Sequence, residues 1–166
     1  MPVMIYGIIV FGANGAGKTT FARELAHLLG CKHMDIEGYA FAPSNTPYTK
    51  PRPRDECRAL MLADIEKHRR FVLSAVTGDF GDAIARHYKL AVHITSPKEL
   101  RMQRLKQRGA DKRFLAWAAA RPLEHIDAWA KTLTCPVVHV DGTQDWRTTA
   151  ANIAKQISPC EVHHRS

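Results

Sequence analysis

Residues 12–19 read G-A-N-G-A-G-K-T, and this short stretch constrains the fold more than any other feature of the sequence. It matches the pattern G-x-x-x-x-G-K-[ST], in which glycines let the backbone curl so that successive N–H groups point at a phosphate. Such a loop needs a strand that leads into it and a helix that leads out of it. The motif therefore predicts a strand, a phosphate-binding loop (the P-loop, residues 12–19) and a helix in that order.

The segments on either side of the P-loop have the required patterns. Met4 to Phe11 is an apolar run rich in isoleucine and valine, which is typical of a buried parallel strand. After the loop, apolar residues recur at helical spacing until Gly30, a residue type that commonly ends helices. These recurring positions are Phe21, Leu25, Leu28 and Leu29. We therefore interpret the P-loop as a nucleotide-binding element.

Further along, apolar strands alternate with helices. The predicted strands are 31–35, 71–77, 90–95 and 136–140, and the predicted helices are 55–70, 96–107, 111–120, 123–133 and 145–157. Asp55 is predicted to cap the first of these helices, and Ser96 to cap the second through a capping box. Residues 38–54 contain four prolines and are predicted to be extended. Five strands that alternate with helices favour an α/β fold, a parallel sheet with helices on both faces.

Length and composition favour one globular domain, because 166 residues with 45% hydrophobic side chains suit a single core. No apolar run is long enough to span a bilayer, and no secretory pattern precedes the first strand, so we expect a cytoplasmic protein without a membrane partner. The net charge of +8 favours anionic partners such as nucleotides, phosphates or nucleic acid.

With these features the chain resembles the small P-loop kinases related to adenylate kinase, shikimate kinase and gluconate kinase. Proteins of this kind are often labelled AAA-family ATPases. The resemblance rests on the P-loop, on the step Asp35-Ile36-Glu37 after the second predicted strand, and on the arginine-rich helix 101–109. It implies a three-layer P-loop NTPase fold with strand order 2-3-1-4-5, formed by residues 1–166 as a single domain.

The same resemblance implies a kinase reaction with ATP and Mg²⁺ as cofactors. It implies an acceptor-binding excursion at about 38–58 and a mobile lid at about 108–122 that supplies arginines. We expect transfer of the γ-phosphoryl group of Mg-ATP to a small anionic acceptor, because arginines cluster in the excursion. Two alternatives stay open: a nucleotide-binding ATPase or switch that acts on a protein partner, and a polynucleotide 5′-hydroxyl kinase. The net charge suits the latter, although the sequence has no recognisable nucleic-acid-binding module.

For the nucleoside triphosphate, the predicted contacts are the P-loop backbone and a few side chains. Lys18 is expected to reach the β- and γ-phosphates, and Thr19 to offer its hydroxyl to Mg²⁺. Arg104 and Arg108 share one face of their predicted helix and match positions that stabilise the moving charge in the related kinases. The predicted donor-binding set is Gly12, Asn14, Gly15, Ala16, Gly17, Lys18, Thr19, Thr20, Arg104 and Gly142.

For the acceptor and the metal, the resemblance points to acids and arginines after the second strand. Asp35 is expected to orient the attacking oxygen and to hold Mg²⁺ together with Thr19. It thereby joins Lys18, Arg104 and Arg108 as a predicted catalytic residue. The predicted acceptor-binding set is Asp35, Glu37, Arg52, Arg54, Gly78, Asp79 and Arg113. Ser74 stands where adenylate kinases carry an acid, which counts against a motor ATPase and leaves Asp79 as a candidate replacement.

Overall fold

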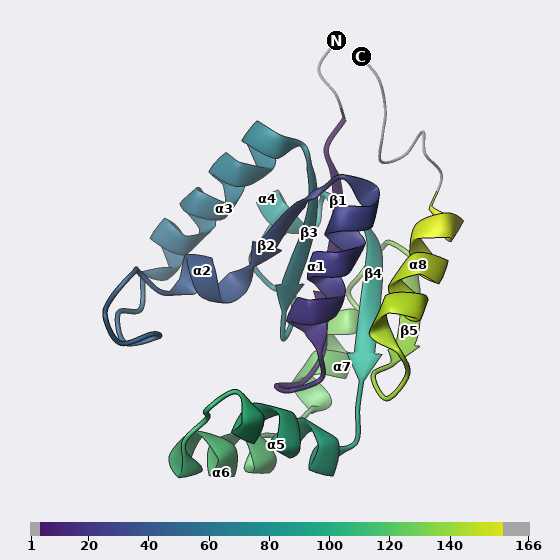
Figure 1. Cartoon of the computed structure of the whole chain (residues 1–166). Coiled ribbons are helices and arrows are strands. Elements are labelled where there is room, and N and C mark those ends of the chain that lie inside the picture. The colour runs from purple at the N-terminus through teal and green to yellow at the C-terminus, as the bar shows by residue number, and fades with distance from the viewer. Residues whose placement is uncertain (1–3, 158–166) are drawn as a thin grey trace.

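The computed structural model of the chain describes residues 4–157 and arranges them around a five-stranded sheet (Figure 1). The strands are β1 (Tyr6–Phe11), β2 (Lys32–Asp35), β3 (Arg70–Ala75), β4 (Tyr88–Thr95) and β5 (Val137–Asp141). All of their pairings are parallel, and the order is β2-β3-β1-β4-β5. The predicted parallel sheet and the strand order implied by the resemblance are confirmed. The predicted single domain, residues 1–166, extends beyond the described residues at both ends.

Helices cover both faces of the sheet, as predicted. They are α1 (Lys18–Leu29), α2 (Ile36–Ala40), α3 (Arg54–His68), α4 (Asp82–Ala85), α5 (Lys98–Gln107), α6 (Lys112–Ala120), α7 (Glu124–Ala130) and α8 (Trp146–Gln156). Alternate residues of the fully buried β1 point to opposite faces. Ile8 and Val10 pack with residues of α1 and α8, whereas Ile9 and Phe11 pack with residues of α3, α4 and α7. The central strand therefore contributes to two apolar layers.

Two predicted helix caps are wrong, each for its own reason. Helix α5 begins at Lys98 without a side-chain cap, and the Ser96 hydroxyl instead donates to the Ala16 carbonyl of the P-loop, at 3.2 Å. Helix α3 begins at Arg54, so Asp55 lies in its first turn, where a carboxylate favours the helix dipole without capping it. In the predicted extended segment, α2 forms because Asp35 Oδ1 accepts from the Glu37 backbone N–H, at 3.2 Å. Tertiary and local hydrogen bonds both compete for such short polar side chains.

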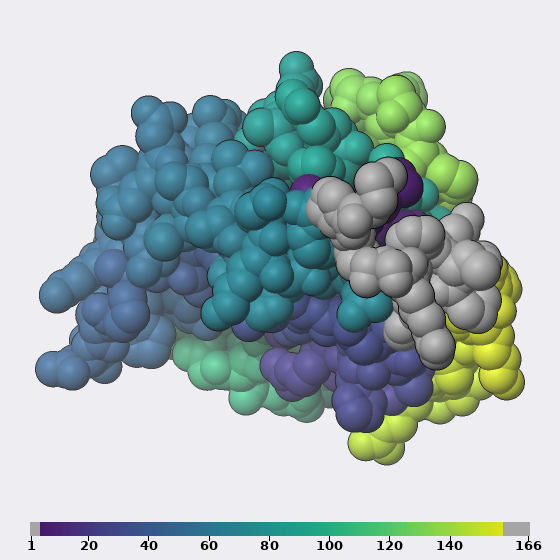
Figure 2. Space-filling view, turned by 90° about the horizontal axis from the view of Figure 1, so that it is seen from above, coloured from purple at the N-terminus to yellow at the C-terminus, as the bar shows by residue number. Residues whose placement is uncertain are grey.

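The parallel strands bring their carboxyl ends to one edge of the sheet. The P-loop follows β1, Asp35 ends β2, and Gly142 follows β5 at this edge, where open α/β sheets bind ligands. Figure 2 shows the opposite end of the molecule, with α3 in blue and α8 in yellow on either side. Within residues 4–157, no helix has the length and apolar character needed to cross a bilayer.

Candidate functional site

The P-loop adopts a conformation that two of its glycines permit. Gly15 and Gly17 have φ values of 81° and 101°, which side chains of other residues rarely tolerate. A Cβ atom on Gly15 would also lie 2.5 Å from the Arg101 carbonyl oxygen, so the loop and α5 can approach only because Gly15 lacks one. The loop then passes directly into α1, whose first residue is Lys18. This local geometry is the one expected for an anion cradle at a helix N-terminus.

Lys18 lies at the centre of the predicted catalytic residues. Its Nζ atom donates to the Ala13 carbonyl at 2.8 Å, across the P-loop. Burial and, to a smaller extent, the positive charge of Arg108 lower the pKa of Lys18 to about 8, while Glu37 and Asp35 partly oppose the shift. The structure therefore brings three predicted residues into electrostatic reach of one ammonium group: Asp35 at the end of β2, Glu37 in α2 and Arg108 directly after α5.

Thr19 and Asp35 carry the oxygen ligands that Mg²⁺ prefers, a hydroxyl and a carboxylate. Thr19 is partly buried in the first turn of α1, and Asp35 ends β2. Among the residues that the structure describes, no three acidic, histidine or cysteine side chains gather closely enough to hold a metal ion. A magnesium ion here would therefore depend on phosphate oxygens and water, as Mg²⁺ commonly does.

The position of the expected third-strand acid is occupied by a buried polar pair. Ser74 is 1% exposed, and its Oγ lies 3.1 Å from His33 Nε2 of the neighbouring strand β2. Burial lowers the pKa of His33. This hydrogen bond satisfies a hydroxyl that would otherwise be costly to bury. Because the pair is engaged within the sheet, neither residue offers a charged ligand to a metal.

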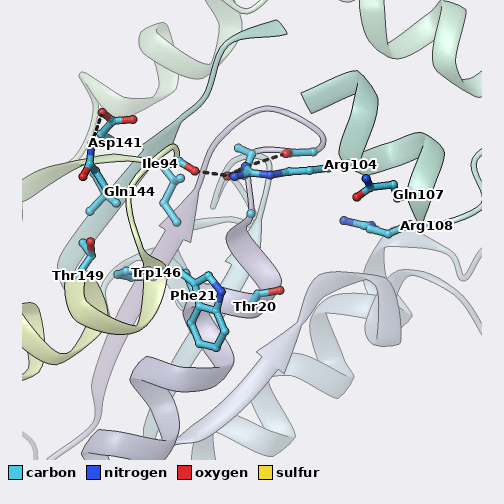
Figure 3. A pocket seen from close by; sticks show the side chains of 15 residues that line it. Thr20, Phe21, Ile94, Arg104, Gln107, Arg108, Asp141, Gln144, Trp146 and Thr149 are labelled. Atoms are coloured by element: carbon cyan, nitrogen blue, oxygen red, sulfur yellow. Dashed lines mark hydrogen bonds between the residues drawn. The ribbon is translucent and has the colours of Figure 1, made fainter. Parts of the chain in front are cut away.

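Arg104 joins the P-loop to the ends of two other strands (Figure 3). Its Nη1 atom donates to the carbonyl oxygens of Gly15 and Ala16, at 3.4 and 3.0 Å, and to Ser96 Oγ at 3.1 Å. Its Nη2 atom donates to the Gly142 carbonyl at 2.6 Å. The side chain thus lies in the predicted donor region, but its terminal nitrogens bind protein oxygens. These partners point to a positioning role for Arg104 in addition to the predicted charge stabilisation.

Two further arginines hold Asn14 of the P-loop. Arg101 is 6% exposed and donates to the Asn14 carbonyl at 3.3 Å. Arg121, between α6 and α7, donates to Asn14 Oδ1 at 3.2 Å, and its guanidinium lies 4.9 Å from the centre of the Trp117 ring. The predicted set omits Arg121. The sequence feature that could have pointed to Arg121 is the proline that follows it. Pro122 ends α6 and favours an extended backbone at the residue before it.

Six residues of the predicted donor-binding set and the predicted catalytic residue Arg108 line one cavity of about 280 Å³ (Figure 3). They are Gly15, Ala16, Gly17, Thr20, Arg104, Arg108 and Gly142. The cavity runs from the P-loop to the connection between β5 and α8, where Gln144 and Trp146 also line it. Sequence reasoning missed these last two residues, because no periodicity or motif distinguishes them from ordinary residues of a turn and a helix start.

A second cavity of about 440 Å³ lies at the ends of β2 and β3. It is lined by Ile36, Ala40, Arg52, Arg54, Cys57, Arg58, Thr77, Asp79 and Phe80. The predicted acceptor residues Arg52, Arg54 and Asp79 therefore come together here. The cavity combines three arginines with apolar walls, which suits a small molecule with an anionic group.

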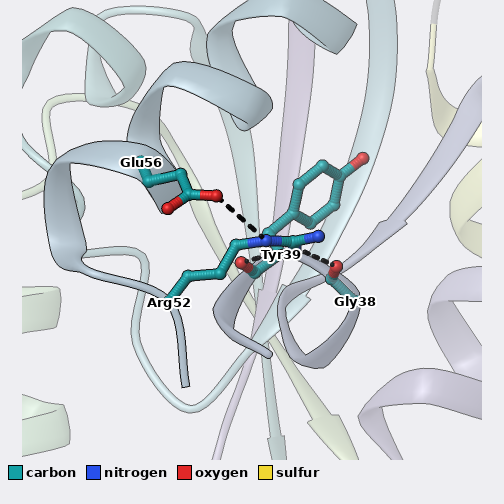
Figure 4. Close-up of polar contacts among 4 residues, drawn as sticks. All are labelled: Gly38, Tyr39, Arg52 and Glu56. Carbon is teal, nitrogen blue, oxygen red and sulfur yellow. Dashed lines mark hydrogen bonds and ion pairs between the residues drawn. The ribbon is translucent and has the colours of Figure 1, made fainter. Parts of the chain in front are cut away.

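The three arginines of this cavity differ in how much of their hydrogen-bonding capacity is free. Arg52 Nη1 donates to the carbonyl oxygens of Gly38 and Tyr39, at 2.9 and 3.0 Å, and its Nε lies 3.7 Å from a carboxylate oxygen of Glu56 (Figure 4). Arg52 therefore braces α2 against the start of α3.

Arg54 and Arg58 have fewer such contacts. Arg54 Nη2 donates to the Asp79 carbonyl at 3.2 Å. Arg58 Nε is buried and has no hydrogen-bond partner among residues 4–157, and its Nη1 lies 4.0 Å from the exposed Asp55. A buried N–H without a partner is uncommon and costly. Arg58 is therefore the arginine of this cavity whose N–H group still lacks a hydrogen-bond acceptor. The predicted set did not include it.

Four predicted acceptor residues do not line this cavity: Asp35 and Glu37, which act on Lys18, and Gly78 and Arg113. Gly78 is buried: its carbonyl accepts from the Tyr88 hydroxyl at 3.0 Å, and a Cβ atom there would clash with Trp129 and Tyr88. Its lack of a side chain therefore serves packing against aromatic rings. Arg113 is exposed on α6 and lines neither cavity, because the start of α6 turns it toward solvent.

Comparisons with known proteins agree with this fold. The sequence matches the family described as AAA domain over residues 8–115. It is 25% identical, over 158 residues, to the uncharacterized protein YqaC of Bacillus subtilis (strain 168), covering 81% of this chain and 87% of that one. The fold is similar to that of shikimate kinase from Acinetobacter baumannii in complex with shikimate, with a TM-score of 0.61, 20% identity and 92% of each chain covered. It is also similar to deoxyadenosine kinase from M. mycoides with bound dATP, with a TM-score of 0.61, 15% identity, and 90% of this chain and 97% of that chain covered.

Proposed function

The chain belongs to the AAA domain family and has the fold of a small P-loop kinase, and from this premise we propose that it transfers the γ-phosphoryl group of ATP to a small anionic acceptor. The observation that carries the proposal is the arginine-lined cavity at the ends of β2 and β3, where Arg58 Nε lacks a partner. A nucleotide switch without an acceptor would have no use for such a cavity at the edge of the sheet that carries its P-loop. In this proposal residues 38–58 are the acceptor segment, residues 108–122 are the lid, and residues 1–166 form one domain.

The donor would bind along the 280 Å³ cavity with its phosphates in the P-loop. Lys18 would then exchange its hydrogen bond with the Ala13 carbonyl for the β- and γ-phosphates. Thr19 and Asp35 would hold Mg²⁺, which when bound neutralises charge on the phosphate oxygens. Arg108, which already acts on Lys18 electrostatically, would face the same phosphates.

The acceptor would bind between Asp35 and the arginines of the second cavity. One of its oxygens would form a bond to the γ-phosphorus while the bond from that phosphorus to the bridging oxygen breaks, and the electron pair would leave with ADP. If that oxygen belongs to a hydroxyl group, its proton would pass to the Asp35 carboxylate; a phosphate oxygen needs no such base. Positioning contributes more than base strength in such a loose transition state.

The direct test is ADP production from Mg-ATP with a panel of acceptors. The panel contains nucleosides, nucleoside monophosphates, sugar acids, shikimate, aminoglycosides and a 5′-hydroxyl oligonucleotide. We expect one anionic small molecule to stimulate turnover and to become phosphorylated. Stimulation by the oligonucleotide alone would support the polynucleotide kinase alternative. ATP binding with no stimulation across the panel would favour a switch that acts on a protein partner.

Replacing Arg58 with alanine is expected to raise the KM for the acceptor by about tenfold or more, because a charge-assisted hydrogen bond contributes about 1.5–3 kcal/mol. The Kd for ATP should stay unchanged, since Arg58 does not line the nucleotide cavity. Initial rates at varied acceptor concentration measure the effect. The matched control is Lys67→Ala, which removes an exposed positive charge at the far end of the same helix. An equal rise in KM for both variants would contradict a specific role for Arg58.

A further inference from the structure

A further cavity, of about 120 Å³, lies between the end of β4 and helices α5 and α7, and we call it the α7 cavity. Arg101 and His93 form its buried part, Leu123 and Ile126 supply apolar walls, and the exposed Asp127 lies at its rim. It shares no lining residue with the arginine-lined cavity at the ends of β2 and β3, and a single one with the nucleotide cavity. The function proposed above therefore leaves the α7 cavity without a role.

Arg101 brings a buried positive charge to this cavity without a negative partner. The residue is 6% exposed, and its Nε and Nη1 atoms donate to the carbonyl oxygens of Ser96 and Asn14, both at 3.3 Å. Its Nη2 atom makes no hydrogen bond to a described residue, and no carboxylate within residues 4–157 forms an ion pair with the guanidinium. A buried charge is costly unless it is paired, so the inner end of the cavity favours an anionic group.

His93 is a second buried polar side chain that lines the cavity. It is 8% exposed, and its ring stacks on that of Phe11, with the centroids 4.5 Å apart. Its ring nitrogens make no hydrogen bond with any residue of the described part of the chain, where Arg58 Nε is the one fully buried side-chain nitrogen without a partner. The nitrogens of His93 therefore remain accessible to a ligand. Burial and the neighbouring His139 lower the pKa of His93, with Asp127 opposing, so the ring is uncharged at neutral pH and offers one N–H donor.

The charge at the rim of the cavity is opposite to the charge at its inner end. Asp127 is exposed, and its carboxylate acts electrostatically on His93 but forms no ion pair with Arg101. A ligand that complements both ends carries a carboxylate for Arg101 and a positively charged amine for Asp127. The volume of the cavity equals that of about four water molecules in the liquid, which suits glycine or alanine.

We propose that the α7 cavity binds a small amino acid, with its carboxylate on Arg101 and His93 and its ammonium group toward Asp127. The carboxylate would bind the free N–H groups of the guanidinium, an arrangement that is both strong and specific in geometry. Ala13 of the P-loop also lines the cavity, so the amino acid would contact the phosphate-binding loop from the face of the sheet that α7 covers. This placement makes it an effector site, distinct from both substrate cavities. The inference goes beyond the proposed function and does not depend on it.

The test is isothermal titration calorimetry of the nucleotide-free, full-length protein at neutral pH with glycine, alanine, acetate and methylamine. We expect glycine and alanine to bind with a Kd of about 1 mM or lower, which is within reach of such small ligands. Acetate, which lacks the ammonium group, should bind about tenfold more weakly, and methylamine should give no measurable binding. Asp127→Asn should weaken glycine binding about tenfold and should not weaken acetate binding, because only the ammonium group loses its partner.

Asp127 is the residue to replace because it is exposed, whereas Arg101 also supports the P-loop. The matched control is Glu124→Gln, which neutralises an exposed acid of the same helix outside the cavity and should keep the wild-type affinity for glycine. Absence of glycine and alanine binding, equal affinity of the wild-type protein for glycine and acetate, or unchanged glycine affinity in Asp127→Asn would each overturn the inference. None of these results involves nucleotide or turnover, so the proposed kinase function would be unaffected by them.

Discussion

Replacing Lys18 with methionine is expected to remove tight binding of nucleoside triphosphates and, at the same time, to make the nucleotide-free protein more stable at neutral pH. Binding should fall because the ammonium group of Lys18 is the charge placed closest to the predicted phosphate position, within the backbone cradle of the P-loop. Stability should rise because the same ammonium group is buried with another positive charge, that of Arg108, nearby.

The size and the pH dependence of the stability effect follow from the pKa of Lys18. The folded protein loses this proton near pH 8, whereas the unfolded chain keeps it to about pH 10.5. Between these values the unfolded chain binds more protons, so the contribution of Lys18 makes stability rise with pH. Below pH 8 the buried charge lowers the free energy of unfolding by about 1.4 kcal/mol for each unit of pKa shift, and the hydrogen bond to the Ala13 carbonyl offsets part of that cost.

Thermal denaturation of both proteins from pH 7 to pH 10 measures this effect, and a fluorescent nucleotide titration measures the binding loss. The melting temperature of Lys18→Met should exceed that of the wild-type protein by several degrees at pH 7, and the difference should shrink above pH 8. Lys67→Met, at an exposed lysine of α3, is the control and should change neither quantity. Undiminished ATP affinity in Lys18→Met would contradict the assignment of residues 12–19 as the phosphate site.

Arg104→Ala is expected to have the largest destabilising effect of the substitutions considered. It would remove the hydrogen bonds to the Gly142 and Ala16 carbonyls, at 2.6 and 3.0 Å, and the one to Ser96 Oγ. Hydrogen bonds from a charged donor contribute about 1.5–3 kcal/mol each, and solvent that reaches the partly exposed Arg104 replaces part of what is lost, so the free energy of unfolding should fall by at least about 3 kcal/mol. ATP affinity should fall as well, because the P-loop and the end of β5 would lose their common support.

Urea or thermal unfolding of Arg104→Ala gives the stability change directly. Arg104→Lys should rescue little of it, because a single ammonium group cannot reach carbonyls on two sides as the planar guanidinium does. Lys106→Ala, which removes an exposed side chain from the same helix, should stay close to wild type. If Arg104→Ala instead kept its stability and lost only turnover, Arg104 would act on the transferred phosphoryl group and would not serve as a support.

The sequence predicted those parts of the fold that depend on local patterns. The glycines of the P-loop and the apolar run before it located β1 and α1, and the alternation of strands and helices predicted the parallel sheet. The strand order came from the resemblance to known kinases, since composition and periodicity do not specify which strands are neighbours. The donor-binding residues of the P-loop could be named because the motif itself forms the site.

The remaining site residues depend on contacts between distant segments. Arg104 binds the carbonyl of Gly142, far along the chain, and Arg121 reaches Asn14 from the connection between two helices. Ser96 has the sequence signature of a cap, yet its hydroxyl binds the P-loop, because a tertiary partner replaces the local one. Arg58 differs from Arg52 and Arg54 in that its buried Nε has no hydrogen-bond partner among the described residues, which no pattern of residue types reveals.

The two outer strands of the sheet, β2 and β5, carry features that discourage aggregation. Exposed strand edges can pair with other chains, and proteins commonly counter this with short strands, charges and proline. Strand β2 has four residues and carries the charged Lys32 and Asp35 at its ends. Strand β5 has five residues, follows Pro136 and ends on the exposed Asp141. The central strands β1, β3 and β4, which carry the longer apolar runs, are enclosed between them, so the sheet presents little edge on which an amyloid-like ladder could grow.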